Sequence, residues 1–361
     1  MTLTASVETS TDTSTTGTFP PTPTPGPVTR LQQRAVVLTR FGGPEGFEVR
    51  DEALPVPGPG EVRVRVLAAS VQFTDTLLRR GKYPDLKQAP PLVLGYDVVG
   101  EVDEVGPGVS SFKRGDRVAD LTMFGSYARF RLLKASQVVR VPRGLDSAEV
   151  VSLVLSWVTA YQLLHREARV ISGQRVLIHG AAGAVGQALI ALGKLAGLKM
   201  WGTGRAKDEA FIRGEGASPI DTASDDDRTM VREGFDVVFD GIGEGGFSRS
   251  FRCVRPGGTL VAYGFSAGIA QGAGLPSLAW WLLRLKLWNA FSGSSARFYS
   301  VTGLRKAHPE WYRADLEKLL KLLDEGRIHP RVSERIGLDD VAAAHRRLEA
   351  GGLKGKIVLC P

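Results

Sequence analysis

Two patterns of hydrophobic and polar positions divide the chain near residue 147. Before it, from Arg34 onward, short apolar runs are separated by Gly and Pro. In residues 61–66 (EVRVRV) every second position is valine and the positions between are charged. Such a strand buries one face and exposes the other, as in antiparallel sheets. We therefore predict a β-rich domain in this first part of the chain.

After residue 147 the pattern is helical at first and then alternates between strands and helices. The expected strands are near-continuous apolar runs at 174–180, 199–204, 235–243 and 259–265. Strands that are apolar on both faces are typical of parallel sheets covered by helices on both sides. The second part is therefore predicted to be a doubly wound parallel sheet, and the fold class is α/β. The last apolar run, near residue 358, could return to the first domain as a strand.

Composition adds limits to this picture. A length of 361 residues suggests two domains. Residues 1–30 are rich in Thr, Ser and Pro and lack an apolar signal-peptide core, so we expect a disordered tail. The net charge of +8 comes from scattered residues, which favours a solvated basic surface and no nucleic-acid partner. The two cysteines, Cys253 and Cys360, exclude a disulfide framework and fit a reducing cytoplasm.

The stretch HGAAGAVG after the first strand of the second part is a candidate nucleotide site. Ala181, Gly183 and Gly186 occupy the three glycine positions of a dinucleotide fingerprint, and only the first glycine is replaced. The turn, with Ala184 and Val185, opens a helix whose free N–H groups and dipole would attract pyrophosphate.

The end of the second strand discriminates between the two nicotinamide cofactors. There the chain reads Thr203, Gly204, Arg205 and then Lys207, with no carboxylate at the strand end. An acid at this place would bind a ribose 2′-hydroxyl, whereas two cations favour a 2′-phosphate. This predicts NADPH, although either cation alone could be a solvated residue at a helix start.

Taken together, these motifs resemble the zinc-independent quinone oxidoreductase branch of the medium-chain dehydrogenase/reductase superfamily, from about Arg34 to Pro361. The resemblance rests on AASVQFTDTLLRRGKYP, PLVLGYDVVGEVDEVGPGVSSFKRGDRV, TAYQLL, RPGGTLVAYG and GKIVL, besides the nucleotide motif. The Trp-rich insert at 275–291 is similar to that of members related to vesicle amine transport protein 1.

The resemblance implies a GroES-like β-rich catalytic domain and a Rossmann domain. We expect the first from 31–157 with 306–361, and the NADPH-binding domain from 158–305. A homodimer is also implied. Zinc-dependent relatives carry a Cys and a GHE motif, where this chain has GYDVVG and no Cys near Val71, so we expect no metal.

The family's cofactor contacts carry over to individual positions. Thr159 matches a threonine near the nicotinamide, and Lys207 matches a lysine on the 2′-phosphate. Thr222 stands where relatives often have a tyrosine beside that phosphate, and Arg205 would replace the contact. Ribose and nicotinamide contacts are expected at Gly243, Gly264, Phe265 and Ser266.

The substrate side departs from the family at QFTD and SWVTAY, where relatives have Asn in place of Gln72 and Asn-Tyr in place of Ser156-Trp157. Our candidate catalytic residues are Gln72, Tyr83 and Trp157. Gln72 and Tyr83 could polarise or protonate a substrate oxygen, and Trp157 would reshape the pocket. Tyr83 could equally be an aromatic cover of the cleft wall.

We expect a cytoplasmic NADPH-dependent reductase of an apolar enone, enal or quinone. Two alternatives stay open: a lipid- or membrane-interacting protein with little turnover, and a tailoring enoyl reductase of a biosynthetic pathway. The insert, with Trp280, Trp281 and Trp288, could line the pocket, cover the dimer edge or rest on a membrane surface beside Arg284 and Lys286. Those two charges argue against a transmembrane helix there.

Overall fold

The computed structural model describes residues 31–83, 86–223, 230–232, 234–264 and 275–361. Residues 32–361 form one compact unit. Their strands build three sheets, and in one of these all strands are parallel.

The first part of the chain, together with two strands near the C-terminus, forms the first two sheets. The smaller has the order β2-β1-β4, and the larger has the order β15-β16-β3-β5-β6-β8 with β7 also paired to β3. Their strands are β1 Gln32–Leu38, β2 Phe47–Ala53, β3 Glu61–Val71, β4 Leu92–Val93, β5 Val98–Val105, β6 Arg117–Asp120, β7 Phe130–Lys134, β8 Val139–Arg140, β15 Val332–Ile336 and β16 Lys356–Leu359. We call this region the β lobe.

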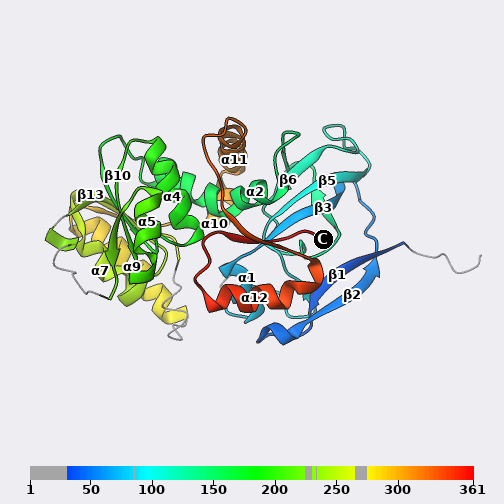
Figure 1. The fold of residues 1–361 in the computed structure, drawn as a ribbon, viewed down its shortest axis with the longest axis horizontal. Helices are drawn as coiled ribbons and strands as arrows, with labels where there is room; N and C mark the ends of the chain where they lie inside the picture. The colour runs from blue at the N-terminus through cyan, green and yellow to red at the C-terminus, as the bar shows by residue number, and fades with distance from the viewer. Residues whose placement is uncertain (1–30, 84–85, 224–229, 233, 265–274) are drawn as a thin grey trace, which may run out of the picture. The chain divides into compact units, whose positions relative to one another are not determined.

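The alternation in β3 predicts its burial correctly. Val62, Val64 and Val66 are almost fully buried, while the charged residues between them are partly or fully exposed. The end of the chain returns as the sequence predicts, because β16 pairs antiparallel with β3. In Figure 1 this red C-terminal segment runs beside the early strands. The pairing brings residues 354–357 next to the start of helix α1 (Phe73–Arg79).

The second part forms the parallel sheet in the order β11-β10-β9-β12-β13-β14. All five strand pairs are parallel, and the order steps outward in both directions from β9, as in a doubly wound dinucleotide fold. The strands are β9 Arg175–His179, β10 Lys199–Gly204, β11 Ser218–Asp221, β12 Phe235–Asp240, β13 Val254–Ala262 and β14 Ser295–Phe298. We call this region the parallel lobe.

Helices cover the parallel sheet in two groups. Helices α4 (Ala184–Leu195) and α5 (Glu209–Glu215) pack near β9, β10 and β11, and α4 and α5 are drawn beside β10 in Figure 1. Helices α7 (Ser248–Arg252) and α9 (Leu275–Phe291) contact the strands from β12 to β14. The chain also has α10 Val301–Ala307, α11 Pro309–Asp324 and α12 Val341–Ala350.

A long helical stretch, Ser147–Glu167, links the lobes. It consists of α2 (Ser147–Ser152), a π-turn at Leu153–Trp157, α3 (Val158–Gln162) and a second π-turn at Leu163–Glu167. Among the described residues only this stretch is long and apolar enough to span a bilayer, and 83% of its most apolar window is buried inside the protein. The domain boundary expected at 157/158 lies inside this helix, and the one at 305/306 lies inside α10. Continuous helices run across both boundaries, and the sequence has no break at either one.

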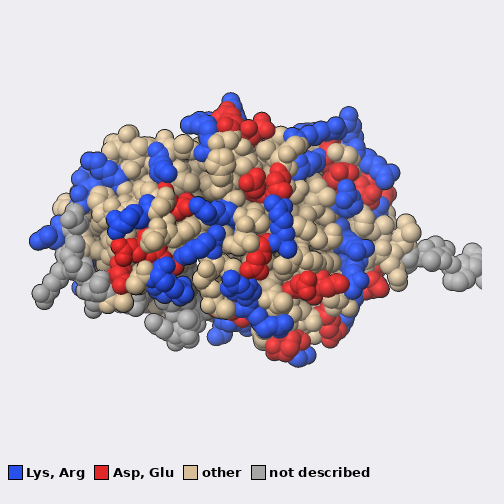
Figure 2. All heavy atoms as spheres, viewed as in Figure 1, with Lys and Arg blue, Asp and Glu red and all other residues tan. Residues whose placement is uncertain are grey.

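Charges of both signs are mixed on the surface. On the face drawn in Figure 2, Lys and Arg side chains lie among Asp and Glu side chains over both lobes. The positive net charge is therefore spread over this face and does not gather into one basic stripe.

Candidate active site

A single cavity of about 920 Å³ has walls from both lobes. Twelve of the residues singled out in the sequence line it: Gln72, Tyr83, Thr159, Gly183, Ala184, Val185, Gly186, Thr203, Gly204, Arg205, Thr222 and Gly264. Phe265 and Ser266 lie outside the described residues. Trp157, Lys207 and Gly243 do not belong to the wall of this cavity.

The turn between β9 and α4 is built from backbone and small side chains. Gly180 has a φ of +73°, so the left-handed residue of the turn lies one position before the expected first glycine. Ala181 has ordinary φ and its N–H donates to Thr203 O at 3.0 Å. Alanine is therefore compatible with that position, because the conformation that needs glycine is met by Gly180.

The third glycine is required by close packing. A Cβ added to Gly186 would lie 2.5 Å from Gly180 O and 2.6 Å from Ala181 O. Gly183 is the N-cap of α4, and its backbone is extended. The N-terminal end of this twelve-residue helix lies at the cavity, since Gly183, Ala184, Val185 and Gly186 all line it. These features fit the pyrophosphate of a dinucleotide.

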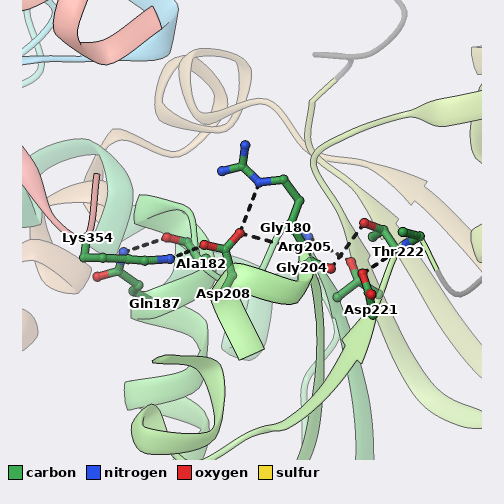
Figure 3. A network of polar contacts seen from close by, with 11 residues as sticks. Gly180, Ala182, Gln187, Gly204, Arg205, Asp208, Asp221, Thr222 and Lys354 are labelled. Atoms are coloured by element: carbon green, nitrogen blue, oxygen red, sulfur yellow. Dashed lines mark hydrogen bonds and ion pairs between the residues drawn. The ribbon is translucent and has the colours of Figure 1, made fainter. Parts of the chain in front are cut away.

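The end of β10 carries both a carboxylate and cations. Asp208, which the sequence analysis did not consider, lines the cavity and is 4% exposed. Arg205 contacts it at 3.3 Å, and Lys354 of the β lobe forms an ion pair with its other oxygen. Figure 3 shows the two basic side chains reaching Asp208 from opposite sides. The expectation that no carboxylate lies near the strand end is thus wrong, because a 3-10 turn at 206–208 folds Asp208 back toward the strand end.

Lys207, the other sequence candidate, is exposed. Its Nζ lies at the rim of the cavity, 3.7 Å from where a Cβ on Gly352 would be. Gly243 has a φ of +69°, and its N–H donates to the carboxylate of Asp240 at 3.0 Å. The glycine thus shapes the turn after β12 without reaching the cavity.

Thr159, Thr203 and Gly264 also line the cavity. The Thr203 hydroxyl accepts from Gly180 N–H at 3.2 Å and lies 3.3 Å from Nδ1 of His179. A Cβ on Gly264 would lie 2.5 Å from Gly241 O. The segments that follow β12 and β13 therefore approach each other closely, which leaves no room for a side chain at Gly264.

The opposite wall, from the β lobe, is a network of polar side chains around Gln72. Its Nε2 donates to Asp97 Oδ2 at 2.5 Å, and its Oε1 accepts from Lys356 Nζ at 2.6 Å. Its backbone N–H donates to Asp75, which completes a capping box at the start of α1. Both ends of the Gln72 amide are thus engaged by this network, and the side chain is only 5% exposed.

Burial shifts the acid–base behaviour of this network. Desolvation, strengthened by the charge of Asp97, raises the pKa of Asp75 to about 8. Desolvation raises the pKa of Asp97 to about 6, although Lys356 and hydrogen bonds from Ser70 oppose the rise. Desolvation also lowers the pKa of Lys356 to about 8, against the attraction of the two carboxylates. The wall can therefore exchange protons near neutral pH.

Tyr83 and Tyr96 form a hydroxyl pair on the same side of the cavity. Their oxygens are 2.8 Å apart, and either hydroxyl could be the donor. Both residues line the cavity. Tyr83 is therefore placed to present its hydroxyl to a ligand while also serving as an aromatic wall, so both interpretations offered by the sequence are compatible with its position.

Trp157 is not brought to this cavity. It is 6% exposed and lines a separate cavity of about 30 Å³, while its neighbour Ser156 lines both. The π-turn at Leu153–Trp157 adds a residue to the helical repeat, which alters the direction of the side chains that follow. Of the two positions at which SWVTAY departs from the family, Ser156 lines the main cavity and Trp157 does not.

The described residues contain no group of three or more His, Cys, Asp or Glu side chains arranged to hold a metal ion. The polar side chains that the β lobe contributes to the cavity wall are those of Gln72, Thr74, Tyr83, Tyr96, Lys354 and Lys356. Amide, hydroxyl, phenol and ammonium groups are poor zinc ligands.

Three functional candidates escaped the sequence analysis: Asp208, Lys354 and Lys356. Lys356 stands in the GKIVL motif that carried the resemblance. Its contact with Gln72 spans 284 positions, and that of Lys354 with Asp208 spans 146. No local pattern signals such pairs. The one available signal is the Lys-Gly-Lys sequence at 354–356, two cations at the start of a strand predicted to return to the first domain.

Known proteins resemble the chain over almost all of its length. The family model described as "Alcohol dehydrogenase GroES-like domain" matches residues 58–143, and the one described as "Zinc-binding dehydrogenase" matches residues 216–359. A 2-haloacrylate reductase of a Burkholderia species is 32% identical over 348 residues, covering 91% of this chain and 98% of the relative. A quinone oxidoreductase of Pseudomonas aeruginosa is 33% identical over 338 residues, covering 91% and 99%.

A solved structure shares the arrangement. The human synaptic vesicle membrane protein VAT-1 homolog-like protein matches with a TM-score of 0.77 at 26% identity, covering 91% of this chain and 98% of that one.

Proposed function

Because the chain belongs to the medium-chain dehydrogenase/reductase superfamily and is an oxidoreductase of that group, we propose that it is an NADPH-dependent, zinc-independent reductase of activated double bonds or quinones. One observation supports this most: a single cavity is lined by the turn at the start of α4, which is suited to pyrophosphate, by the polar side chains Gln72, Tyr83 and Lys356, and by apolar side chains. These apolar side chains, which we call the apolar recess, include Leu77, Leu155, Leu282, Phe298 and Val301.

The cradle supports the cofactor assignment. N–H groups at the start of α4 would bind the pyrophosphate, Arg205 would face the 2′-phosphate, and Thr159 and Gly264 would adjoin the nicotinamide. When bound, the cofactor supplies the hydride. The backbone around Gly186 is packed so closely that it leaves no room for a side chain at this position of the cradle.

The β-lobe wall supports the chemistry. The Tyr83 hydroxyl, paired with Tyr96, would donate a hydrogen bond to a substrate oxygen as negative charge develops there. Gln72 holds Lys356 and Asp97 in fixed orientation at the same wall. The apolar recess would exclude water and favour an enone, enal or quinone of apolar character.

Nicotinamide oxidation with a panel of enones, enals, acrylates and quinones tests the proposal. We expect NADPH to be consumed with at least one acceptor, and activity to survive dialysis against a strong chelator. Tyr83→Phe and Gln72→Ala should lower turnover more than NADPH affinity, while Lys318→Met, on the exposed side of α11, serves as a control. NADPH binding without consumption of any acceptor would contradict the proposal.

A second candidate function is contact with a membrane surface, favoured by one observation on α9. Trp280, Leu283, Leu287 and Phe291 are 54%, 46%, 43% and 84% exposed, and their spacing of three or four residues puts them on one helix face. Co-sedimentation with anionic vesicles tests this. Binding that Leu287→Lys with Phe291→Lys abolishes, while NADPH affinity is unchanged, would support the second function.

Cytoplasmic location and a homodimer belong to the same proposal. Cell fractionation and light scattering of the purified chain would test them.

A further inference from the structure

The end of β10 combines features that ordinarily select opposite cofactors. Asp208 is a buried carboxylate in the cavity wall, of the kind that binds a ribose 2′-hydroxyl and repels a 2′-phosphate. Arg205 and Lys354 in the same wall are cations of the kind that bind a phosphate. The balance between them decides which dinucleotide the site prefers.

Lys354 reaches this place from the other lobe. It precedes β16 in the β lobe, and its Nζ lies 4.7 Å from the centre of the Phe211 ring on α5. Its ammonium forms the ion pair with Asp208 Oδ1, while Arg205 contacts Oδ2, so each carboxylate oxygen has its own cation. Figure 3 shows the Lys354 side chain extended toward Asp208, past the turn that contains Ala182.

The two cations differ in how freely they can move. The side chain of Arg205 is 58% exposed, whereas that of Lys354 is 31% exposed and is held between Asp208 and Phe211. Desolvation acts to raise the pKa of the Asp208 carboxyl, but the pKa is lowered overall. The side-chain hydrogen bond from Lys354, followed by the one from Arg205, contributes to this lowering. The carboxylate thus stays charged, and its charge is balanced within the wall.

We propose that Lys354 is the residue that determines cofactor preference: it neutralises Asp208 and adds a cation beside the 2′-phosphate. This proposal rests on the proposed function, because it concerns the same dinucleotide site. Without Lys354, the Asp208 carboxylate would face the 2′-phosphate and keep Arg205 as its ion-pair partner. The site would then lose its preference for NADPH and accept NADH nearly as well.

Affinities measured by calorimetry for NADPH and NADH test this inference without reference to turnover. Lys354→Met should lower the ratio of NADPH to NADH affinity by about tenfold or more, since a charge-assisted contact is lost. Asp208→Asn should keep or increase the ratio. The double variant Lys354→Met/Asp208→Asn should recover most of the loss, because the repelling charge is gone as well.

Two fragments of the dinucleotide and one control variant show whether Lys354 acts on the 2′-phosphate. Lys354→Met should weaken 2′,5′-ADP but leave 5′-AMP unchanged, and Lys318→Met should alter neither. An unchanged NADPH to NADH ratio in Lys354→Met would overturn the inference. So would a double variant that stays as poor as Lys354→Met, because Asp208 would then have no part in the preference. Wild-type protein that binds neither dinucleotide would instead overturn the proposed function.

Discussion

The two walls of the cavity are built on different principles. The parallel-lobe wall at β9–α4 consists of backbone and small residues, and its geometry is set by short contacts such as those around Gly186. The β-lobe wall is a chain of nearly buried side chains, Lys356–Gln72–Asp97, and the pKa values of its two ionisable members, Lys356 and Asp97, are displaced. One wall depends on shape and the other on charge.

This difference separates binding from chemistry. A wall of backbone donors keeps its properties at any pH at which the fold persists, which suits a cofactor site. A wall of coupled ionisable groups changes its protonation near neutral pH, which suits proton transfer. Damage to the first should therefore appear as lost affinity, and damage to the second as pH-dependent loss of turnover and stability.

The largest effect is expected for Lys356→Met. Removing a buried cation leaves Asp97 without its compensating charge, and breaking such an arrangement costs roughly 3–5 kcal/mol. The pKa of Asp97 is about 6 in the wild type, so its carboxyl is mostly protonated at pH 5. The loss of stability caused by Lys356→Met should therefore be larger at pH 7 than at pH 5. Urea unfolding at the two pH values measures it. Equal losses at both pH values would count against charge coupling in this wall.

The next effect concerns Asp75, whose pKa is raised to about 8. An acid with a raised pKa in the folded state keeps its proton where the unfolded chain has lost it, so its contribution to stability falls as pH rises from about 4 to 8. Asn cannot ionise and can still accept from Gln72 N–H. Asp75→Asn should therefore be more stable than wild type at pH 8 by a few kcal/mol, and closely similar at pH 4.

Thermal unfolding across this pH range checks the sign. Asp324→Asn, at the exposed end of α11, is the matched control and should show no such trend. Two results together would refute the raised pKa of Asp75: a wild-type free energy of unfolding that rises from pH 5 to 8, and a stability difference between Asp75→Asn and wild type that does not change with pH.

The same contrast explains what could be predicted from sequence. The turn HGAAGAVG is local: eight consecutive residues carry the glycines and the helix start, so the cradle and most of its lining residues could be named. The alternation in β3 was equally visible, because burial of one face imposes a period of two on that strand, and β16 was visible as a short apolar run.

The β-lobe wall could be predicted only in part. Gln72 and Tyr83 came from motifs. Lys356 becomes a neighbour of Gln72 only through the pairing of β16 with β3, and Tyr83 meets Tyr96 across a contact between two positions outside the strands. Trp157 was misplaced because a π-turn departs from the regular helical period. Asp208 was missed because a 3-10 turn returns it to the strand end, three residues after Arg205.

The smallest expected effect tests the cradle with two glycines of one turn. Gly186→Ala would put a methyl group 2.5 Å from Gly180 O, so the backbone must move, at a cost of about 1–2 kcal/mol. Gly183→Ala would put its Cβ 3.2 Å from the same oxygen and leave φ at an ordinary −76°, so a shift of a few tenths of an ångström can accommodate it. We expect Gly186→Ala to weaken NADPH and NADH alike, because pyrophosphate is common to both, and to do so equally at pH 6 and pH 8. Titration of both variants by calorimetry measures this. If Gly183→Ala were the more damaging of the two, or if the loss changed with pH, the cradle would not be the shape-defined wall described above.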